Sequence, residues 1–328
     1  MILDLAETRA TTVLEAIKTI VSAGASEPTR IDLENLKAVG EIALGLGRVE
    51  PPALVDCSPA ELVSAIGRGE DALVVVRVLA VSSIIGGLID PARMDRLRSF
   101  ARALEAEEEY LDILDDAAAG RLGEATDRLT KRSEESFLRY SGNDASQDPD
   151  GELMPFGEGN EDRRLEIRYR ELGELPVGTF GRAFFDHFVS NGLSFPGNEA
   201  GQIEGFALTH DTCHLLSGYP TDEAGEILVA AFIGGMHTRK PMESQVLPAI
   251  FSWHLGIRMN WLVGRHEGAL DPWTFWDAWD RGAATRFDVF DPDWDFWAAT
   301  RLDLEELRRE FHVPSARVLE PGFSNTVR

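Results

Sequence analysis

The sequence predicts an all-α protein built from two helical domains. Three observations indicate this class. Apolar residues recur at spacings of three and four through almost the whole first 139 residues, prolines and glycines fall at the joints between these segments, and the composition changes sharply between residues 140 and 162. A chain of 328 residues with 44% hydrophobic residues is long enough to bury a large core in each of two domains.

The N-terminal domain, residues 1–139, reads as a bundle of about six helices. Helical periodicity covers residues 12–21, 32–46, 59–66, 72–88 and 91–104. The stretch 105–127 is dense in Glu and Asp with few basic partners, and we interpret it as a solvated helix face. The apolar run 72–89 contains an arginine and two glycines, so it predicts a buried helix and not a membrane span.

Residues 140–162 are rich in Gly, Asn, Asp, Ser and Pro, and we interpret them as a linker to a second domain at 163–328. The formal charge of -24 and a pI near 4.6 argue against a nucleic-acid partner, which requires a basic face. Two cysteines form no disulfide framework, so a reducing, cytoplasmic location is expected. The N-terminus reads as an amphipathic helix and not as a secretory signal.

The strongest chemical signal is the segment His210-Asp-Thr-Cys-His214, followed by Glu226. Residues four apart on a helix project from one face, which is the spacing that lets one helix supply two imidazoles to a transition metal. Asp211 lies on the flank of that face, where it is either a third ligand or a group that orients one. Cys213 points away from both histidines and is predicted to be packed in the core.

A helical hairpin is expected to complete the site. Gly218 is a good helix stop, Pro220 cannot continue the helix, and Thr221 or Asp222 can cap a second one. The depth of Glu226 in the second helix then matches that of His214 in the first. The predicted ligand set His210, Asp211, His214 and Glu226 suits zinc, with iron or manganese as alternatives.

This motif resembles the zinc-binding signature of the coenzyme Q (ubiquinone) biosynthesis family that we call COQ-four, in which HDxxH is followed after eleven residues by Glu. The Gly218-Tyr219 turn agrees with it, and so does the pattern P-x-GT-x-G-x-A at residues 176–183. The tryptophan-rich stretch 273–313 resembles the end of the family's domain, with Asp295 where Glu is usual and Asp303 where Pro is usual. The likeness covers about residues 165–313.

The resemblance implies ubiquinone biosynthesis, with a polyprenylated hydroxybenzoate-type intermediate bound at a divalent metal. The implied chemistry replaces the ring carboxylate at C1 by hydroxyl, so the protein would act in decarboxylation and hydroxylation of the head group. The alternative is a noncatalytic lipid-binding scaffold that organises other quinone biosynthesis enzymes around a structural metal. An HD-type phosphohydrolase is a third interpretation, but a separate upstream His and a distant Asp are not evident.

Further expectations concern the surroundings of the motif. The apolar segments 227–236 and 246–262 form either core alone or a groove for an isoprenoid tail, which would bring peripheral contact with the inner membrane. His187 lies among phenylalanines on its predicted helix and is interpreted as a core or surface residue. His237 and His254 have no partner at metal spacing and are interpreted in the same way. In the N-terminal half, residues 81–97 loosely resemble TerB-like tellurite-resistance bundles. A homo-oligomer is possible on the sequence alone.

Overall fold

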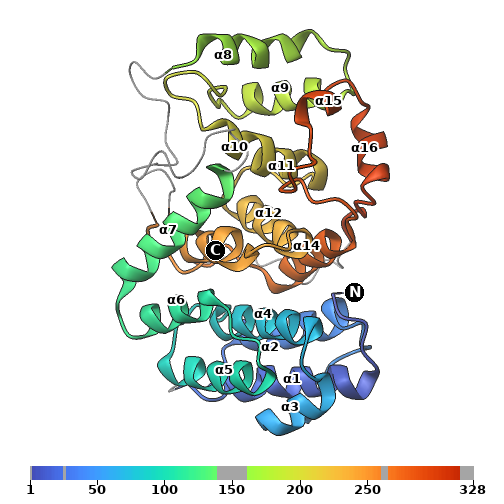
Figure 1. Cartoon of the computed structure of the whole chain (residues 1–328). Coiled ribbons are helices and arrows are strands. Elements are labelled where there is room, and N and C mark those ends of the chain that lie inside the picture. The colour runs from blue at the N-terminus through green and yellow to red at the C-terminus, as the bar shows by residue number, and fades with distance from the viewer. Residues whose placement is uncertain (1, 25–26, 139–160, 260–264, 318–328) are drawn as a thin grey trace.

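The computed structural model describes residues 2–24, 27–138, 161–259 and 265–317. In these residues the protein is all-α, as predicted, and its only extended pairings there are isolated bridges, Thr179 with Asp303 and Leu255 with Glu267. Figure 1 shows α1–α6 at the bottom of the view with α7 rising out of them, α12 and α14 above, and the α8–α11 segment at the top. None of the described helices is long and apolar enough to cross a membrane.

The N-terminal half follows the predicted periodicity. Side chains of Thr29, Ser58 and Asp90 cap three of its helices by accepting hydrogen bonds from first-turn amides. Its elements are α1 (Glu7–Val21), α2 (Arg30–Ala38), the π-helix η1 (Val39–Ala43), the 3-10 turn η2 (Pro51–Ala53), α3 (Pro59–Ile66), α4 (Glu70–Ile84), α5 (Pro91–Leu104), α6 (Glu109–Ala118) and α7 (Leu122–Leu138).

The acidic stretch 105–127 runs from the end of α5 through α6 into α7. Glu105 ends α5 in a left-handed conformation, and Gly120, also at positive φ, separates α6 from α7. The carboxylates of this stretch have basic partners supplied by neighbouring helices. Arg98 on α5 binds Asp115 at 2.7 Å, and Arg132 on α7 binds Glu109 at 2.8 Å. Ion pairs therefore hold α5, α6 and α7 together at this surface.

In the C-terminal half Thr179 caps a helix as expected. Asp295 and Asp303, the two departures from the COQ-four pattern, are also helix caps, which explains an acidic residue at each position. The elements are α8 (Arg163–Arg170), η3 (Glu171–Glu174), α9 (Phe180–Ser190), α10 (Glu204–Phe206), the π-helix η4 (Ala207–Asp211), α11 (Thr212–Ser217), α12 (Glu223–Met236), the π-helix η5 (Met242–Val246), α13 (Leu247–Trp253), α14 (Pro272–Ala284), α15 (Phe296–Ala299) and α16 (Leu304–Glu310).

The apolar segment 246–262 is shorter as a helix than its composition predicts. Helix α13 ends at Trp253, and Gly256 adopts a positive φ of 62° just beyond it. The bridge between Leu255 and Glu267 then turns the chain back. Tertiary pairing thus overrides a local helical preference. Residues 260–264, the end of that predicted segment, lie outside the described residues.

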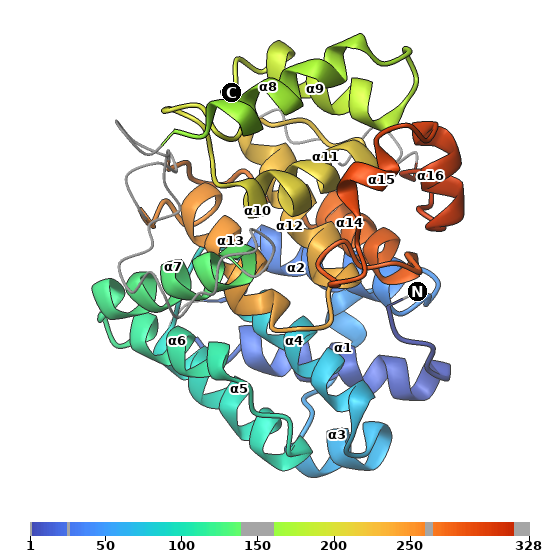
Figure 2. The same ribbon diagram turned by 45° about the horizontal axis from the view of Figure 1, so that its top comes forward.

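Helix α14 connects the two halves. It packs on α12 and also on α2 and η1 of the N-terminal half. One hydrophobic cluster accordingly contains residues of both halves, from Leu14 and Leu36 to Trp276 and Trp279, whereas a second cluster around Phe184 belongs mainly to the C-terminal half. The division at residues 140–162 stays a prediction, and most of that stretch lies outside the described residues. Helix α7 contacts α13, and Figure 2 shows the two helices side by side.

Candidate metal centre

The predicted helical hairpin is present. The first arm consists of η4 and α11, and it ends at Gly218, whose φ of 79° is left-handed. The second arm is α12, which Asp222 caps by accepting a hydrogen bond from the Gly225 amide at 2.8 Å. These local signals bring Glu226 back to the level of the two histidines.

Three of the four predicted ligands lie together. His210 Nε2 is 3.1 Å from Glu226 Oε2 and 3.3 Å from His214 Nε2. His214 Nε2 is in turn 3.4 Å from Glu226 Oε1. Both histidines are buried, and Glu226 is half-buried. Two imidazole nitrogens and a carboxylate therefore converge on one point.

The ring of each histidine is fixed by a neighbour. His214 Nδ1 lies 3.0 Å from the carbonyl oxygen of Tyr219. A carbonyl only accepts hydrogen bonds, so Nδ1 carries a proton, and in a metal-bound site the neutral ring would direct the lone pair of Nε2 toward the ion. This backbone contact is typical of metal-ligating histidines. The His210 ring stacks on Phe206 with centroids 4.5 Å apart.

Glu226 is a carboxylate in this arrangement. Burial raises its pKa, but the hydrogen bonds and charges of His210 and His214 outweigh burial and hold the pKa at about 2. The pKa of His214 is affected in the opposite sense. Burial lowers it, and the stronger combined effect of Glu226, Asp211 and the Tyr219 carbonyl raises it. The site thus carries a fixed negative charge beside two nitrogen donors.

The spacing of the three side chains fits a zinc ion. Ligands about 2.0 Å from a tetrahedral Zn²⁺ are roughly 3.3 Å from one another. The separations of 3.1, 3.3 and 3.4 Å between the three donor groups agree with this value. Two nitrogen donors and one carboxylate also match the chemistry of zinc. His210, His214 and Glu226 are the residues that would hold the ion.

Asp211 is not part of the converging set in this conformation. Its Oδ1 lies 3.3 Å from Nε2 of His187 on α9, and its Oδ2 is buried without a hydrogen-bond partner among the described residues. The His187 ring lies 5.4 Å from that of His214. The Asp211–His187 pair therefore lies behind His214, between the cluster and α9. Ligation by Asp211 stays a prediction.

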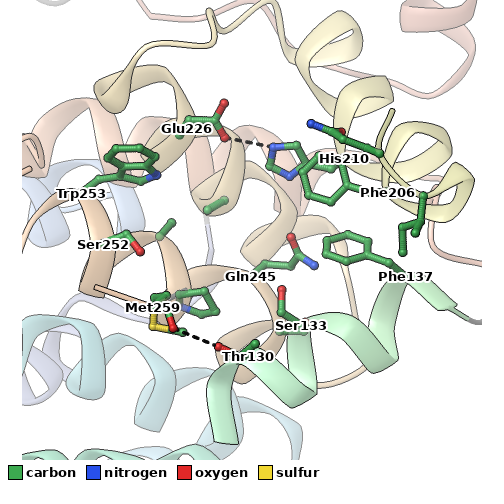
Figure 3. A pocket seen from close by; sticks show the side chains of 16 residues that line it. Thr130, Ser133, Phe137, Phe206, His210, Glu226, Gln245, Ser252, Trp253 and Met259 are labelled. Carbon is green, nitrogen blue, oxygen red and sulfur yellow. Dashed lines mark hydrogen bonds and ion pairs between the residues drawn. The ribbon is translucent and has the colours of Figure 1, made fainter. Parts of the chain in front are cut away.

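A cavity of about 280 Å³ opens beside the cluster. Figure 3 shows His210 and Glu226 at one end and Thr130 and Met259 at the other. Aromatic and aliphatic side chains line much of the wall, and uncharged polar groups line most of the rest, with His210 and Glu226 at the metal end. The lining residues are Thr130, Ser133, Phe137, Gln202, Ile203, Phe206, His210, Glu226, Ala230, Ser244, Gln245, Pro248, Ala249, Ser252, Trp253 and Met259. Among these residues there is no lysine or arginine.

The remaining candidates behave as packing groups. His254 Nε2 donates to the Ile85 carbonyl at 2.7 Å, and His237 Nδ1 lies 2.8 Å from Asp288 Oδ2. Cys213 is buried in the aromatic cluster, and burial raises the pKa of its thiol well above the usual value. The sequence did not identify Phe206 or the residues of α7 in the cavity wall. Phe206 stands four before His210, so helical spacing alone could have indicated that contact.

Comparisons with known proteins add little to this geometry. No family model and no curated protein matches the chain. Among solved structures, a "putative ubiquinone biosynthesis protein" from Nostoc punctiforme aligns with a TM-score of 0.33 and 17% identity, over 76% of this chain and 100% of that chain. A TM-score this low carries no argument, and no comparison bears on the TerB-like resemblance of the N-terminal half.

Proposed function

We propose that the protein is a metal-dependent enzyme of quinone biosynthesis, acting on the head group of a polyprenylated hydroxybenzoate-type precursor in C1 decarboxylation and hydroxylation. The observation that carries this proposal is the position of His210 and Glu226, which converge with His214 and also line the cavity. The motif resemblance supports the substrate class. Zinc is the preferred ion, with iron or manganese as alternatives.

Each residue has a definable role. A divalent ion held here would polarise an oxygen of the bound head group and stabilise negative charge on it. The Tyr219 carbonyl keeps the lone pair of His214 Nε2 directed at the site, and Phe206 holds the plane of His210. Glu226 contributes one negative charge. Replacing a ring carboxylate by hydroxyl also consumes an oxidant, for which dioxygen or a partner enzyme is required.

The size and lining of the cavity favour this substrate class. Pockets for drug-sized ligands span roughly 300–1,000 Å³, so a volume of about 280 Å³ accommodates a ring-sized head group. A long isoprenoid tail would have to leave the cavity, and we propose peripheral contact with the membrane for that reason. The absence of lysine and arginine from the lining residues disfavours a phosphohydrolase, whose substrate carries more negative charge.

The second candidate is a scaffold protein with a structural metal, which recruits other quinone biosynthesis enzymes. It is favoured by Asp211, which follows His210 in the sequence and whose buried Oδ2 has no hydrogen-bond partner in the part of the chain that the structure describes. If Asp211 became a fourth protein ligand, the site would be closed, as structural zinc sites are. X-ray absorption of the zinc-loaded protein separates the candidates: an open, water-bearing position supports the enzyme, and four protein ligands support the scaffold.

Metal analysis of the purified protein tests the site itself. We expect about one equivalent of zinc or iron, and we expect His210→Ala and Glu226→Ala each to abolish it, because two remaining ligands hold a divalent ion poorly. His312→Ala is the matched control, since His312 is exposed and outside the cluster. Full metal retention in either ligand variant, with normal helix content, would refute the assignment.

A further inference from the structure

Helix α7 of the N-terminal half forms one wall of the cavity beside the candidate metal centre. Thr130, Ser133 and Phe137 line the cavity, and their spacing of three and four residues places them on one face of the helix. In Figure 3 this helix closes the end of the cavity opposite Glu226. The N-terminal half is therefore part of the pocket and not only a neighbouring bundle.

Three contacts fix α7 to three separate parts of the cavity wall. Gln245 Nε2 of η5 donates to Ser136 Oγ at 3.1 Å. Thr130 Oγ1 lies 3.5 Å from the carbonyl oxygen of Met259. The Phe137 ring meets the edge of Phe206 with centroids 4.8 Å apart, and Phe206 is the ring on which His210 stacks. A change in the position of α7 would therefore act, through Phe137 and Phe206, on the ring of the candidate metal ligand His210.

An ion-pair cluster anchors α7 in this position. Glu109 on α6 accepts hydrogen bonds from Arg132 of α7 at 2.8 Å and from Lys240, in the loop after α12, at 3.0 Å. Side-chain hydrogen bonding by Arg132 leads the effects that hold the pKa of Glu109 at about 2, so the carboxylate stays charged. One carboxylate therefore joins α6 of the N-terminal bundle, α7 in the cavity wall and the loop that follows the helix carrying Glu226.

The polar groups at this end of the cavity specify a ligand. The Gln245 amide nitrogen is occupied by Ser136, and its carbonyl oxygen points into the cavity (Figure 3). The hydroxyl of Ser133 points into the same space. An amide oxygen only accepts, whereas a serine hydroxyl both donates and accepts. Around them, Phe137, Phe206 and Trp253 offer aromatic surfaces.

We propose that α7 is the specificity wall of this site, and that Ser133 and Gln245 position a ring-bearing ligand through a hydroxyl on the side of the ring away from Glu226. The inference rests on the proposed function, because it assumes that the other side of the ring faces the metal. Ser133 is a positioning residue: it selects the hydroxyl and leaves metal binding unchanged.

Binding of two probes to the full-length, zinc-loaded protein tests this role. 4-Hydroxybenzoate carries the hydroxyl, and benzoate lacks it. By calorimetry we expect the wild type to bind 4-hydroxybenzoate roughly three- to tenfold more tightly, which is the range for one net hydrogen bond. Ser133→Ala should remove most of this preference while the affinity for benzoate and the zinc content stay the same. Ser99→Ala on α5 is the matched control and should keep the preference.

The outcomes separate the two proposals. If the wild-type protein binds no zinc, the proposed function is overturned. One equivalent of zinc together with an unchanged preference in Ser133→Ala would overturn only the role of α7. Failure of the zinc-loaded wild type to bind either probe would also overturn it, because the cavity would then not accept a hydroxyaryl ligand. A preference lost equally in Ser99→Ala would show a general effect of serine removal and would contradict the assignment.

Discussion

Glu243 on η5 is a buried carboxyl group, and its surroundings disfavour the ionised form. Only 1% of the residue is exposed, and its Oε2 has no hydrogen-bond partner among the described residues. Burial is the main cause that raises its pKa to about 7, and the charges of Glu108 and Glu109 add to it against the opposing effects of Lys240 and its own backbone amide. The folded protein therefore keeps this proton at pH values where the unfolded chain has lost it.

This shift predicts a pH dependence of stability. The pKa of this carboxyl group is 4.5 in the unfolded chain and about 7 in the folded protein. The contribution of Glu243 to the free energy of unfolding is therefore fully present below pH 4.5 and is lost as the pH rises through about 7. We expect Glu243→Gln to be more stable than wild type at pH 8, by up to about 3 kcal/mol, with the gain shrinking toward pH 5. Urea unfolding at several pH values measures this. Exposed Glu310→Gln is the control, and parallel curves for Glu243→Gln and wild type would show that Glu243 is not responsible.

At the scale of elements, the close approach of α12 and α14 positions Glu226 relative to the core. A Cβ added at Gly282 of α14 would lie 1.9 Å from the Phe232 carbonyl oxygen on α12. We expect Gly282→Ala to force the helices apart and to destabilise the protein by about 1–3 kcal/mol. Thermal and urea unfolding measure the change. Gly123→Ala, on α7 with no atom within 4 Å of an added Cβ, is the control and should be neutral or slightly stabilising. Equal stability of the two variants would contradict the packing argument.

The hairpin was predictable because its signals are local. A helix stop at Gly218, a cap at Asp222 and the four-residue spacing of His210 and His214 need no knowledge of the rest of the chain. The direction of Asp211 was not predictable, because a π-helical turn ends at this residue and changes its angular position from that of a regular α-helix.

The other misses at this scale have non-local causes. The end of α13 depends on pairing between Leu255 and Glu267. The α7 wall depends on a contact between Phe137 and Phe206, which are separated by the stretch that changes composition. The sequence predicts helix up to about residue 139, but helical periodicity does not identify the surface that covers a given face of a helix.

At the scale of the whole molecule, a buried polar chain crosses between the two halves. Trp276 Nε1 on α14 donates to Asn35 Oδ1 on α2 at 2.7 Å, and Asn35 Nδ2 donates to Ser82 Oγ on α4 at 2.9 Å. Asn35 and Ser82 are completely buried. A second link runs from His254 to the carbonyl oxygen of Ile85. Because buried polar groups are costly when unpaired, the halves satisfy each other's hydrogen bonds.

This coupling predicts that the protein unfolds in one transition. We expect a single calorimetric peak whose calorimetric and van 't Hoff enthalpies agree, because separating the halves would expose Trp276 and break the shared hydrophobic cluster. Asn35→Leu leaves the Trp276 N–H and the Ser82 hydroxyl without their partner, so the whole peak should move to lower temperature, by an amount equivalent to about 1–3 kcal/mol. Within each protein, circular dichroism and tryptophan fluorescence should report the same midpoint as each other. Two separate peaks, with Asn35→Leu shifting only one of them, would contradict the coupling and would instead favour the division into independent domains near residues 140–162 that the composition predicts.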